Sequence, residues 1–194
     1  YFLEKGIPVI GVEPAKNVAE VAKNKGIPTE VLFFGEKTAK LLLNKGKGAD
    51  LLIGNNVLAH VPDINDFVKG LKILLNPDGV ITLEFPHLKH LVDKTLFDTI
   101  YHEHFSYFSF LTVERIFNAH NLTIFDVEEF PIHGGSLRIY VCHATKSARQ
   151  PSDRVYKMRK LESDCGFDKI ELYQGFEDKV QSIKRSFLSF LIEK

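Results

Sequence analysis

Residues 99–109 place two histidines, a carboxylate and two tyrosines within a few positions of one another. Ionisable and aromatic side chains together are typical of a partly dry pocket in which a proton must move. Tyr101 and His104 are three residues apart, so one helical turn or a tight loop would face them the same way. On a regular strand, Tyr101 would instead share a face with Glu103. The alternative for these histidines is a capping or hydrogen-bonded core position.

Composition limits the classes of partner. Lys and Arg number 25, as do Asp and Glu, which argues against an electrostatic nucleic-acid or membrane footprint. The chain contains no apolar run as long as a bilayer span and opens with no signal peptide. Its two cysteines, Cys142 and Cys165, form no metal-ligand pair. We therefore expect a cytoplasmic protein that acts on a small molecule, whose oligomeric state the sequence does not indicate.

The first half of the chain alternates apolar strands with amphipathic helices. This rhythm predicts a parallel sheet covered by helices on both faces. The predicted strands are 7–12, 29–34, 50–55 and 80–84, and the predicted helices are 15–25, 36–45 and 63–75.

The pattern changes after a predicted helix at 112–120. Two strands, 122–130 and 136–142, follow with only residues 131–135 between them, which predicts an antiparallel hairpin. A parallel α/β sheet finished by such a hairpin is the layout of the class I S-adenosylmethionine-dependent methyltransferases, a Rossmann-like fold. A fold alone does not fix the reaction.

Ligand sites in open parallel sheets lie beyond the carboxyl ends of the strands. Glu13 follows the first predicted strand, where a carboxylate can accept hydrogen bonds from both ribose hydroxyls of a nucleoside. The alternative is a carboxylate that stabilises the N-terminus of the next helix. Phe33 and Phe34 close the second strand, where a ring could cover an adenine, and core packing is the alternative for at least one of them.

The third predicted strand ends in two amides, Asn55 and Asn56, and His60 follows closely. Buried amides at this position would need hydrogen-bond partners. We expect these three residues to lie at the same edge as Glu13.

A glycine-rich turn is expected after the first strand of such a fold, and the sequence has none in that place. A ribose-binding carboxylate normally follows the second strand. We therefore expect residues 1–5 to end the first helix of the fold, with the first strand upstream of Tyr1. The chain begins without Met and ends within a predicted helix, so we expect a fragment that is inactive by itself.

Six blocks, in order, carry a more specific resemblance. The chain resembles the nucleotide-sugar C-methyltransferase family. The blocks are VEPA at 12–15, NNVLAHVPD at 55–63, LLNPDG at 74–79, EFP at 84–86, YHEHFSYFS at 101–109 and HGGSLR at 133–138.

The resemblance implies methylation of C3 in a 4-keto-deoxysugar linked to a nucleoside diphosphate, typically dTDP, with S-adenosylmethionine as cofactor. It implies a partial methyltransferase domain at 1–148 and a helical linker at 149–194, leading to an absent C-terminal nucleotide-sugar-binding domain. A purely solvated helix is the alternative for the linker. Zinc is implied only for an N-terminal domain outside this chain, and no metal is expected here.

The resemblance also implies residue roles in the sugar pocket. His104 matches the general base, and Tyr101 and Glu103 match neighbours that line the pocket. His60 matches a second histidine near the transferred methyl group and the keto oxygen.

For the cofactor, the resemblance matches Glu13 with the ribose carboxylate and Asn55 or Asn56 with a contact after the third strand. The block of His133, Gly134, Gly135 and Ser136 is expected near the sugar phosphate or the pocket wall. His87 receives no role.

The chemistry suits these groups. A C3 proton beside a C4 ketone is weakly acidic, and a neutral imidazole can remove it near neutral pH. The enolate oxygen then needs a donor, for which His60 or the Tyr101 hydroxyl is a candidate. Two alternatives stay open: an O- or N-methyltransferase of the same fold, and a protein that binds nucleotide sugar without turnover.

Overall fold

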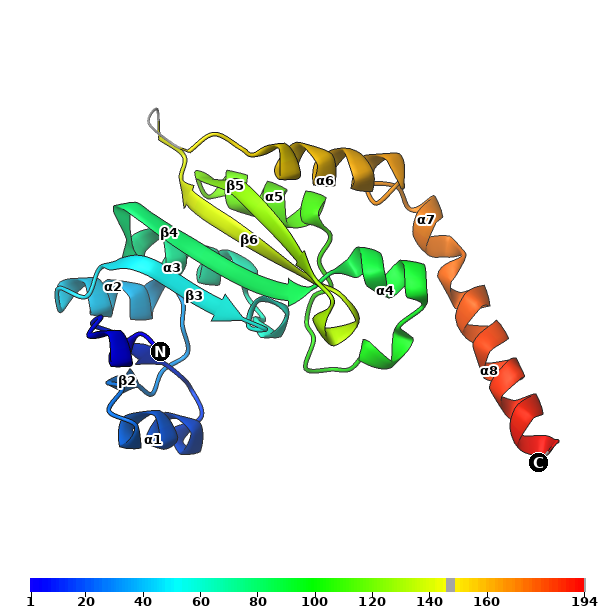
Figure 1. Ribbon diagram of the computed structural model, residues 1–194, viewed down its shortest axis with the longest axis horizontal. Coiled ribbons are helices and arrows are strands. Elements are labelled where there is room, and N and C mark those ends of the chain that lie inside the picture. The colour runs from blue at the N-terminus through cyan, green and yellow to red at the C-terminus, as the bar shows by residue number, and fades with distance from the viewer. Residues whose placement is uncertain (146–148, 194) are drawn as a thin grey trace.

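The computed structural model describes residues 1–145 and 149–193, and it has the predicted α/β fold. A four-stranded mixed sheet in the order β3-β4-β6-β5 forms its centre, and a small two-stranded sheet of β1 and β2 lies apart (Figure 1). The strands are β1 (Gly11–Val12), β2 (Thr29–Glu30), β3 (Ala49–Asn55), β4 (Leu75–Pro86), β5 (Leu122–Phe130) and β6 (Ser136–His143).

The helices occupy most of the predicted positions, and α4 was not predicted. The α-helices are α1 (Lys16–Asn24), α2 (Glu36–Asn44), α3 (Ile64–Leu74), α4 (Leu88–Lys94), α5 (Phe110–Ala119), α6 (Asp153–Asp164), α7 (Glu171–Gln174) and α8 (Phe176–Ile192). Short 3₁₀ helices are η1 (Leu3–Lys5), η2 (Leu58–His60), η3 (Phe97–Thr99) and η4 (Ile132–Gly134).

Strand pairing confirms the predicted change from a parallel sheet to a hairpin. β3 and β4 are parallel, whereas β6 pairs antiparallel with both β4 and β5. Between the pairs Ala49–Leu75 and Leu51–Val80 the register shifts. Residues 76–79, the predicted NPDG turn, therefore leave the ladder at the start of β4.

The first two strands are much shorter than predicted. Backbone pairing between them covers only Gly11 with Thr29 and Val12 with Glu30, although strands were expected over 7–12 and 29–34. Neither strand pairs with β3. A strand is held by the ladder of a neighbour, so one short partner supports only a short strand. β1 and β2 therefore form a small sheet separate from the four-stranded one.

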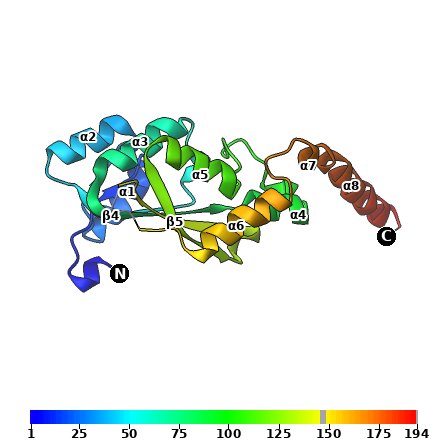
Figure 2. The same ribbon diagram turned by 90° about the horizontal axis from the view of Figure 1, so that it is seen from above.

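The core lies on one face of the large sheet. Residues Ile81, Leu83 and Phe85 of β4 alternate toward it and are almost completely buried, together with Leu137 and Ile139 of the adjacent β6. Figure 2 shows α2, α3 and α5 in a row along one side of this sheet. Burying a side chain of this size contributes about 1.5–3 kcal/mol, so this face holds the fold together.

The opposite face differs from the prediction of helices on both sides. Leu51 and Ile53 of β3 alternate away from the core and are 43% and 52% exposed. The neighbouring strands place a polar pair on that face, where Arg138 Nη2 lies 2.6 Å from Glu84 Oε2. This face therefore combines exposed apolar residues of β3 with a polar pair between β4 and β6.

The contact between α2 and α3 depends on a glycine. A Cβ at Gly70 would lie 2.6 Å from the carbonyl carbon of Gly35, so α3 can approach the start of α2 only without a side chain there. Asp66 of α3 accepts a hydrogen bond from the Glu36 backbone N–H at 3.2 Å, which caps α2.

The C-terminal helices behave differently from one another. α6 packs on the sheet with Val155 and Met158 buried in the main core, whereas α8 extends away from the rest of the molecule (Figures 1 and 2). α8 has no buried residue. None of the described helices combines the length and apolar character that a membrane span requires. The proposed division at residue 148 stays a prediction.

Candidate active site

Two segments meet where the predicted catalytic residues lie. η2 follows β3, and the loop at 99–109 joins it through the Phe105 backbone N–H, which donates to the Ala59 carbonyl at 2.9 Å. His60, the last residue of η2, places Nδ1 3.0 Å from the Glu103 carbonyl oxygen. The carbonyl can only accept, so His60 Nδ1 donates this hydrogen bond.

Tyr101 and His104 face the same way, as their spacing predicted. A tight turn brings them together, because the His104 backbone N–H donates to the Tyr101 carbonyl at 3.0 Å. The Tyr101 hydroxyl lies 2.9 Å from His104 Nε2, within hydrogen-bond distance. A phenol and an imidazole are thus held as one proton-exchanging pair.

His60 stands edge-on to His104, with ring centroids 4.8 Å apart. The pKa of His104 lies below its usual value of 6.5, first because of partial burial and then because of the nearby His60. The Thr99 carbonyl and Glu103 act in the opposite direction. His104 is therefore mostly neutral at pH 7, the form that accepts a proton.

The remaining residues of this loop have supporting positions. Glu103 is exposed, and its backbone carbonyl rather than its carboxylate makes the contact with His60. Tyr107 was not predicted to take part, yet its hydroxyl accepts the Tyr101 backbone N–H at 3.2 Å and its ring lies 5.6 Å from that of His104. The sequence signal that could have included Tyr107 in the site was its position within the same aromatic segment, residues 99–109.

The structure joins a predicted cofactor residue to the predicted sugar block. Asn56 Nδ2 lies 3.2 Å from His133 Nε2, and both residues adopt left-handed backbone conformations with φ of 53° and 52°. Asn56 Oδ1 is buried without a hydrogen-bond partner. A buried acceptor of this kind can receive a ligand N–H or O–H.

The other members of the HGGS block shape the backbone rather than expose polar side chains. Gly134 has a φ of 80°, and its carbonyl accepts the Lys94 ammonium at 2.8 Å. The Gly135 carbonyl accepts a hydrogen bond from the His87 backbone N–H at 3.0 Å. Ser136 is fully buried, and its hydroxyl donates to Ile132 at 3.3 Å. This segment therefore packs against the start of α4.

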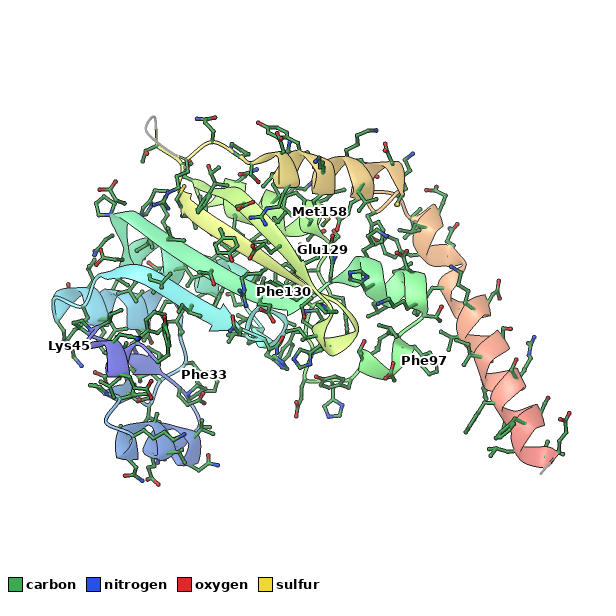
Figure 3. All side chains as sticks on the ribbon, viewed as in Figure 1. Phe33, Lys45, Phe97, Glu129, Phe130 and Met158 are labelled. Atoms are coloured by element: carbon green, nitrogen blue, oxygen red, sulfur yellow. The ribbon has the colours of Figure 1, made fainter. Side chains whose placement is uncertain are left out.

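The predicted adenosine-binding residues follow the small sheet. Glu13 Oε1 accepts the Ala15 N–H at 2.8 Å, so one oxygen stabilises the start of α1, the alternative considered from sequence. Phe34 packs edge-on to Phe67 at 5.5 Å and belongs to the core. Phe33 is 82% exposed and projects from the loop after β2 (Figure 3). Of the two rings, only Phe33 is free to cover a ligand.

Asn55 is the last residue of β3 and is exposed. It stands opposite Glu84 of β4, a buried carboxylate that binds Arg138 through two donors, Nε at 3.2 Å and Nη2 at 2.6 Å. This pair was missed from sequence. It joins the end of β4 to the start of β6, next to the end of β3 where Asn55 lies.

A second buried pair was also missed. His87 Nε2 lies 2.6 Å from Glu162 Oε1, and both side chains are fully buried. The carboxylate oxygens also accept the N–H groups of Phe110 and Leu111 at 2.8 and 2.9 Å. No local signal marks this contact, because 75 residues separate the pair.

Two cavities differ in size and place. One of about 20 Å³ lies among His87, His104 and His133, and its volume suits about one water molecule. The other, of about 380 Å³, lies between β5 and α6, where Glu129, Phe130 and Met158 line it (Figure 3). None of the predicted site residues lines the larger one. The candidate site is therefore an open surface at the strand ends, not an enclosed chamber.

Comparisons with known proteins agree with this arrangement. A model described as "Methyltransferase domain" matches residues 1–127, about two thirds of the chain. The chain belongs to the methyltransferase family. A second model, "C-methyltransferase C-terminal domain", matches residues 131–194. The C-methyltransferase NovU of Streptomyces niveus is 33% identical over 183 residues, which are 94% of this chain and 43% of that protein.

The second model and NovU both make this chain similar to C-methyltransferases, as the sequence blocks indicated. The chain spans less than half the length of NovU. The ubiquinone biosynthesis O-methyltransferase of Bartonella tribocorum is 30% identical over 77 residues, 39% of this chain and 31% of that enzyme.

Solved structures confirm the class I methyltransferase fold. The PH0226 protein of Pyrococcus horikoshii gives a TM-score of 0.55 at 16% identity, covering 73% of this chain and 74% of that one. The magnesium protoporphyrin IX methyltransferase of Synechocystis with bound S-adenosylhomocysteine gives 0.55 at 15%, covering 72% and 66%. At such identities the likeness concerns the fold alone.

Proposed function

We propose that this chain forms the methyl-transferring part of an S-adenosylmethionine-dependent C-methyltransferase acting on a nucleotide-linked 4-keto-deoxysugar. The observation that supports it most is the trio of His104, Tyr101 and His60, a base, a hydroxyl donor and a second imidazole in contact at the strand ends. The match of residues 131–194 to the C-methyltransferase model favours carbon as the methylated atom.

The cofactor fits two features of this chain. Asn56 Oδ1 is a buried acceptor without a partner, and the Glu13 carboxylate uses one oxygen for Ala15, which leaves the other for a ribose hydroxyl. Glu13 directly follows β1 and Asn56 directly follows β3, and open α/β sheets bind nucleotides beyond the carboxyl ends of their strands. S-adenosylmethionine would supply an electrophilic methyl group there.

The residues of the chain then perform the proton chemistry. His104 removes the C3 proton of the sugar through Nε2, for which general-base help contributes about 10²- to 10⁴-fold. The Tyr101 hydroxyl, freed from His104 Nε2 when that nitrogen takes the proton, donates to the enolate oxygen. His60 is held by the Glu103 carbonyl with its ring 4.8 Å from that of His104, which makes it a further polar group beside the base.

Other features of the proposal follow the family resemblance. Residues 149–194 would lead toward a nucleotide-sugar-binding domain, and the HGGS block would lie near the sugar phosphate or form part of the pocket wall. Cytoplasmic localisation and a zinc-binding N-terminal domain stay predictions. The 30% identity with an O-methyltransferase over 77 residues favours transfer to oxygen as the second candidate.

Isotope exchange distinguishes these candidates. The intact protein is incubated in D₂O with dTDP-4-keto-6-deoxyglucose and without S-adenosylmethionine, and deuterium at C3 is followed by NMR. We expect exchange with the parent, at least about 10²-fold slower exchange with His104→Gln, and parental exchange with His102→Gln, whose side chain is exposed. If no C3 exchange occurs and the sugar is nevertheless methylated in a parallel reaction with S-adenosylmethionine, the oxygen or nitrogen methyltransferase would be supported instead.

A further inference from the structure

Three side chains outside the proposed active site converge at the start of α4. His87 precedes α4, His90 lies in its first turn, and Glu129 lies near the end of β5. Their potential metal-ligand atoms all lie within 4.8 Å of one another. The proposed methyl transfer uses none of these side chains.

His87 has an unused nitrogen. Its side chain is 1% exposed, and Nε2 is taken by Glu162 Oε1 at 2.6 Å, while Nδ1 is buried without a hydrogen-bond partner. Buried polar atoms are normally satisfied, so Nδ1 needs a partner from outside the protein. A carboxylate that holds the other ring nitrogen is the contact that typically orients a metal-ligating histidine.

His90 and Glu129 stand at the separation of two metal ligands. His90 Nε2 lies 3.4 Å from Glu129 Oε1, which is long for a hydrogen bond. Two ligands about 2.0–2.1 Å from a tetrahedral zinc ion are about 3.4 Å apart. These side chains are 24% and 48% exposed, so a cation can reach them from solvent.

The backbone fixes the place of His90. A Cβ at Gly135 would lie 2.2 Å from His90 Cδ2, so the imidazole can lie flat on this segment only because residue 135 is glycine. Gly135 has a φ of 132°, a conformation that also favours glycine. The HGGS block therefore builds this site as well as the wall of the proposed pocket.

Two lysine ammonium groups, those of Lys89 and Lys94, lie near His90. The two neighbouring ammonium groups have other partners, since Lys94 donates to the Gly134 carbonyl and Lys89 pairs with Asp93.

We propose that His87, His90 and Glu129 bind one divalent transition-metal ion of the zinc type, with Glu162 positioning His87. Two imidazoles and one carboxylate are a donor set that zinc accepts, with water in the fourth position. The ion would tie the start of α4 to the end of β5. It has no part in the methyl transfer, so this proposal stands independently of the proposed function.

Zinc titration of the intact protein tests the site. The protein is stripped with a chelator and titrated with ZnCl₂ by calorimetry, and bound zinc is counted per chain by elemental analysis. We expect the parent to bind one more zinc ion than His90→Asn and Glu129→Gln. Glu162→Gln should retain the site with affinity weaker by about 10- to 100-fold. Co²⁺ in place of Zn²⁺ should give stronger visible absorption of a four-coordinate site in the parent than in His90→Asn or Glu129→Gln.

Matched controls separate this site from the active-site histidines. His102→Asn and Asp98→Asn change exposed residues of the same types, and both should keep the parental stoichiometry. Circular dichroism in chelator verifies that the His90 and Glu129 variants are folded. Equal stoichiometry in the parent and both variants would overturn the proposal, and so would loss of the ion in His104→Asn with its retention in His90→Asn.

Discussion

His104 is the residue whose environment most directly sets a measurable property. Its pKa is lowered by burial and by His60, so it stays unprotonated to a lower pH than an ordinary histidine. A general base works only when unprotonated, and activity is lost as the pH falls through its pKa. The acid limb of kcat/KM for the intact enzyme should therefore lie below pH 6.5, the usual histidine value.

Replacing His60 tests this reasoning. His60→Gln removes the imidazole whose charge lowers the pKa of His104, so that pKa should rise and the acid limb should move to higher pH. The measurement is the pH dependence of kcat/KM for the parent and the variant. An acid limb that stays in place while kcat falls would mean that His60 acts on the substrate and not on His104.

Glu13 is the residue that should separate cofactor binding from chemistry. Glu13→Ala should weaken S-adenosylmethionine binding by about 1.5–3 kcal/mol, the contribution of hydrogen bonds to a charged acceptor. Calorimetric titration of the intact protein measures this, with Glu20→Ala on the exposed side of α1 as the control. Because Glu13 also caps α1, the melting temperature of the Glu13→Ala variant is recorded as well. Unchanged affinity would show that Glu13 has only the capping role.

Local spacing predicted some of these residues and not others. Tyr101 and His104 are three residues apart, a spacing that places them on the same side of one turn, and the structure shows their side chains within hydrogen-bond distance. The contact of Asn56 with His133 joins residues 77 positions apart and depends on how two loops meet after folding. Phe33 and Phe34 are identical in type and adjacent, so only the structure shows which one enters the core.

At the scale of elements, a buried carboxylate is one of the contacts that join α6 to the domain. Glu162 accepts hydrogen bonds from His87 and from two backbone N–H groups at the start of α5. A carboxylate at a helix N-terminus is favoured both by these donors and by the helix dipole. Arg159 of α6 adds an ion pair with Glu114 of α5 at 2.6 Å. The start of the predicted linker is thus packed on the sheet.

Removing Glu162 should destabilise the protein strongly. Glu162→Ala leaves a buried histidine and two helix N–H groups without their acceptor, a loss of about 3–5 kcal/mol for a broken buried pair. Urea unfolding of the intact protein measures it. Asp164→Asn, which loses only an exposed pair with Lys160, should change the free energy of unfolding by less than about 1 kcal/mol. Similar small losses in both variants would contradict the buried network.

Periodicity located the elements better than it located their ends. The helices at 16–24, 36–44 and 64–74 match their amphipathic patterns within a residue or two. The strands at 11–12 and 29–30 fall short because strand length depends on a paired neighbour, which the pattern of one segment does not contain. α4 was missed because its seven residues are too few for a clear helical period.

At the scale of the whole molecule, β3 is the exposed part of the large sheet. It is an end strand in the order β3-β4-β6-β5, and Leu51 and Ile53 on its outer face are about half exposed. A strand whose outer edge has no neighbour in the sheet, and which carries exposed apolar side chains, invites pairing between molecules. The two-stranded sheet of β1 and β2 does not cover this edge by hydrogen bonding.

The 194-residue chain by itself should therefore aggregate or populate a loosely packed state, and bind S-adenosylmethionine far more weakly than the intact protein. Placing a charge on the outer face, as in the double variant Leu51→Lys, Ile53→Lys, should reduce its aggregation, because charged residues on an end strand oppose edge-to-edge pairing. Light scattering and thermal melts, with and without the cofactor, measure both effects. Val18→Lys, an exposed apolar position on α1 away from β3, is the matched control and should leave aggregation unchanged. A sharp, cooperative melt of the parental chain that shifts upward with S-adenosylmethionine would show that the exposed strand does not limit its folding.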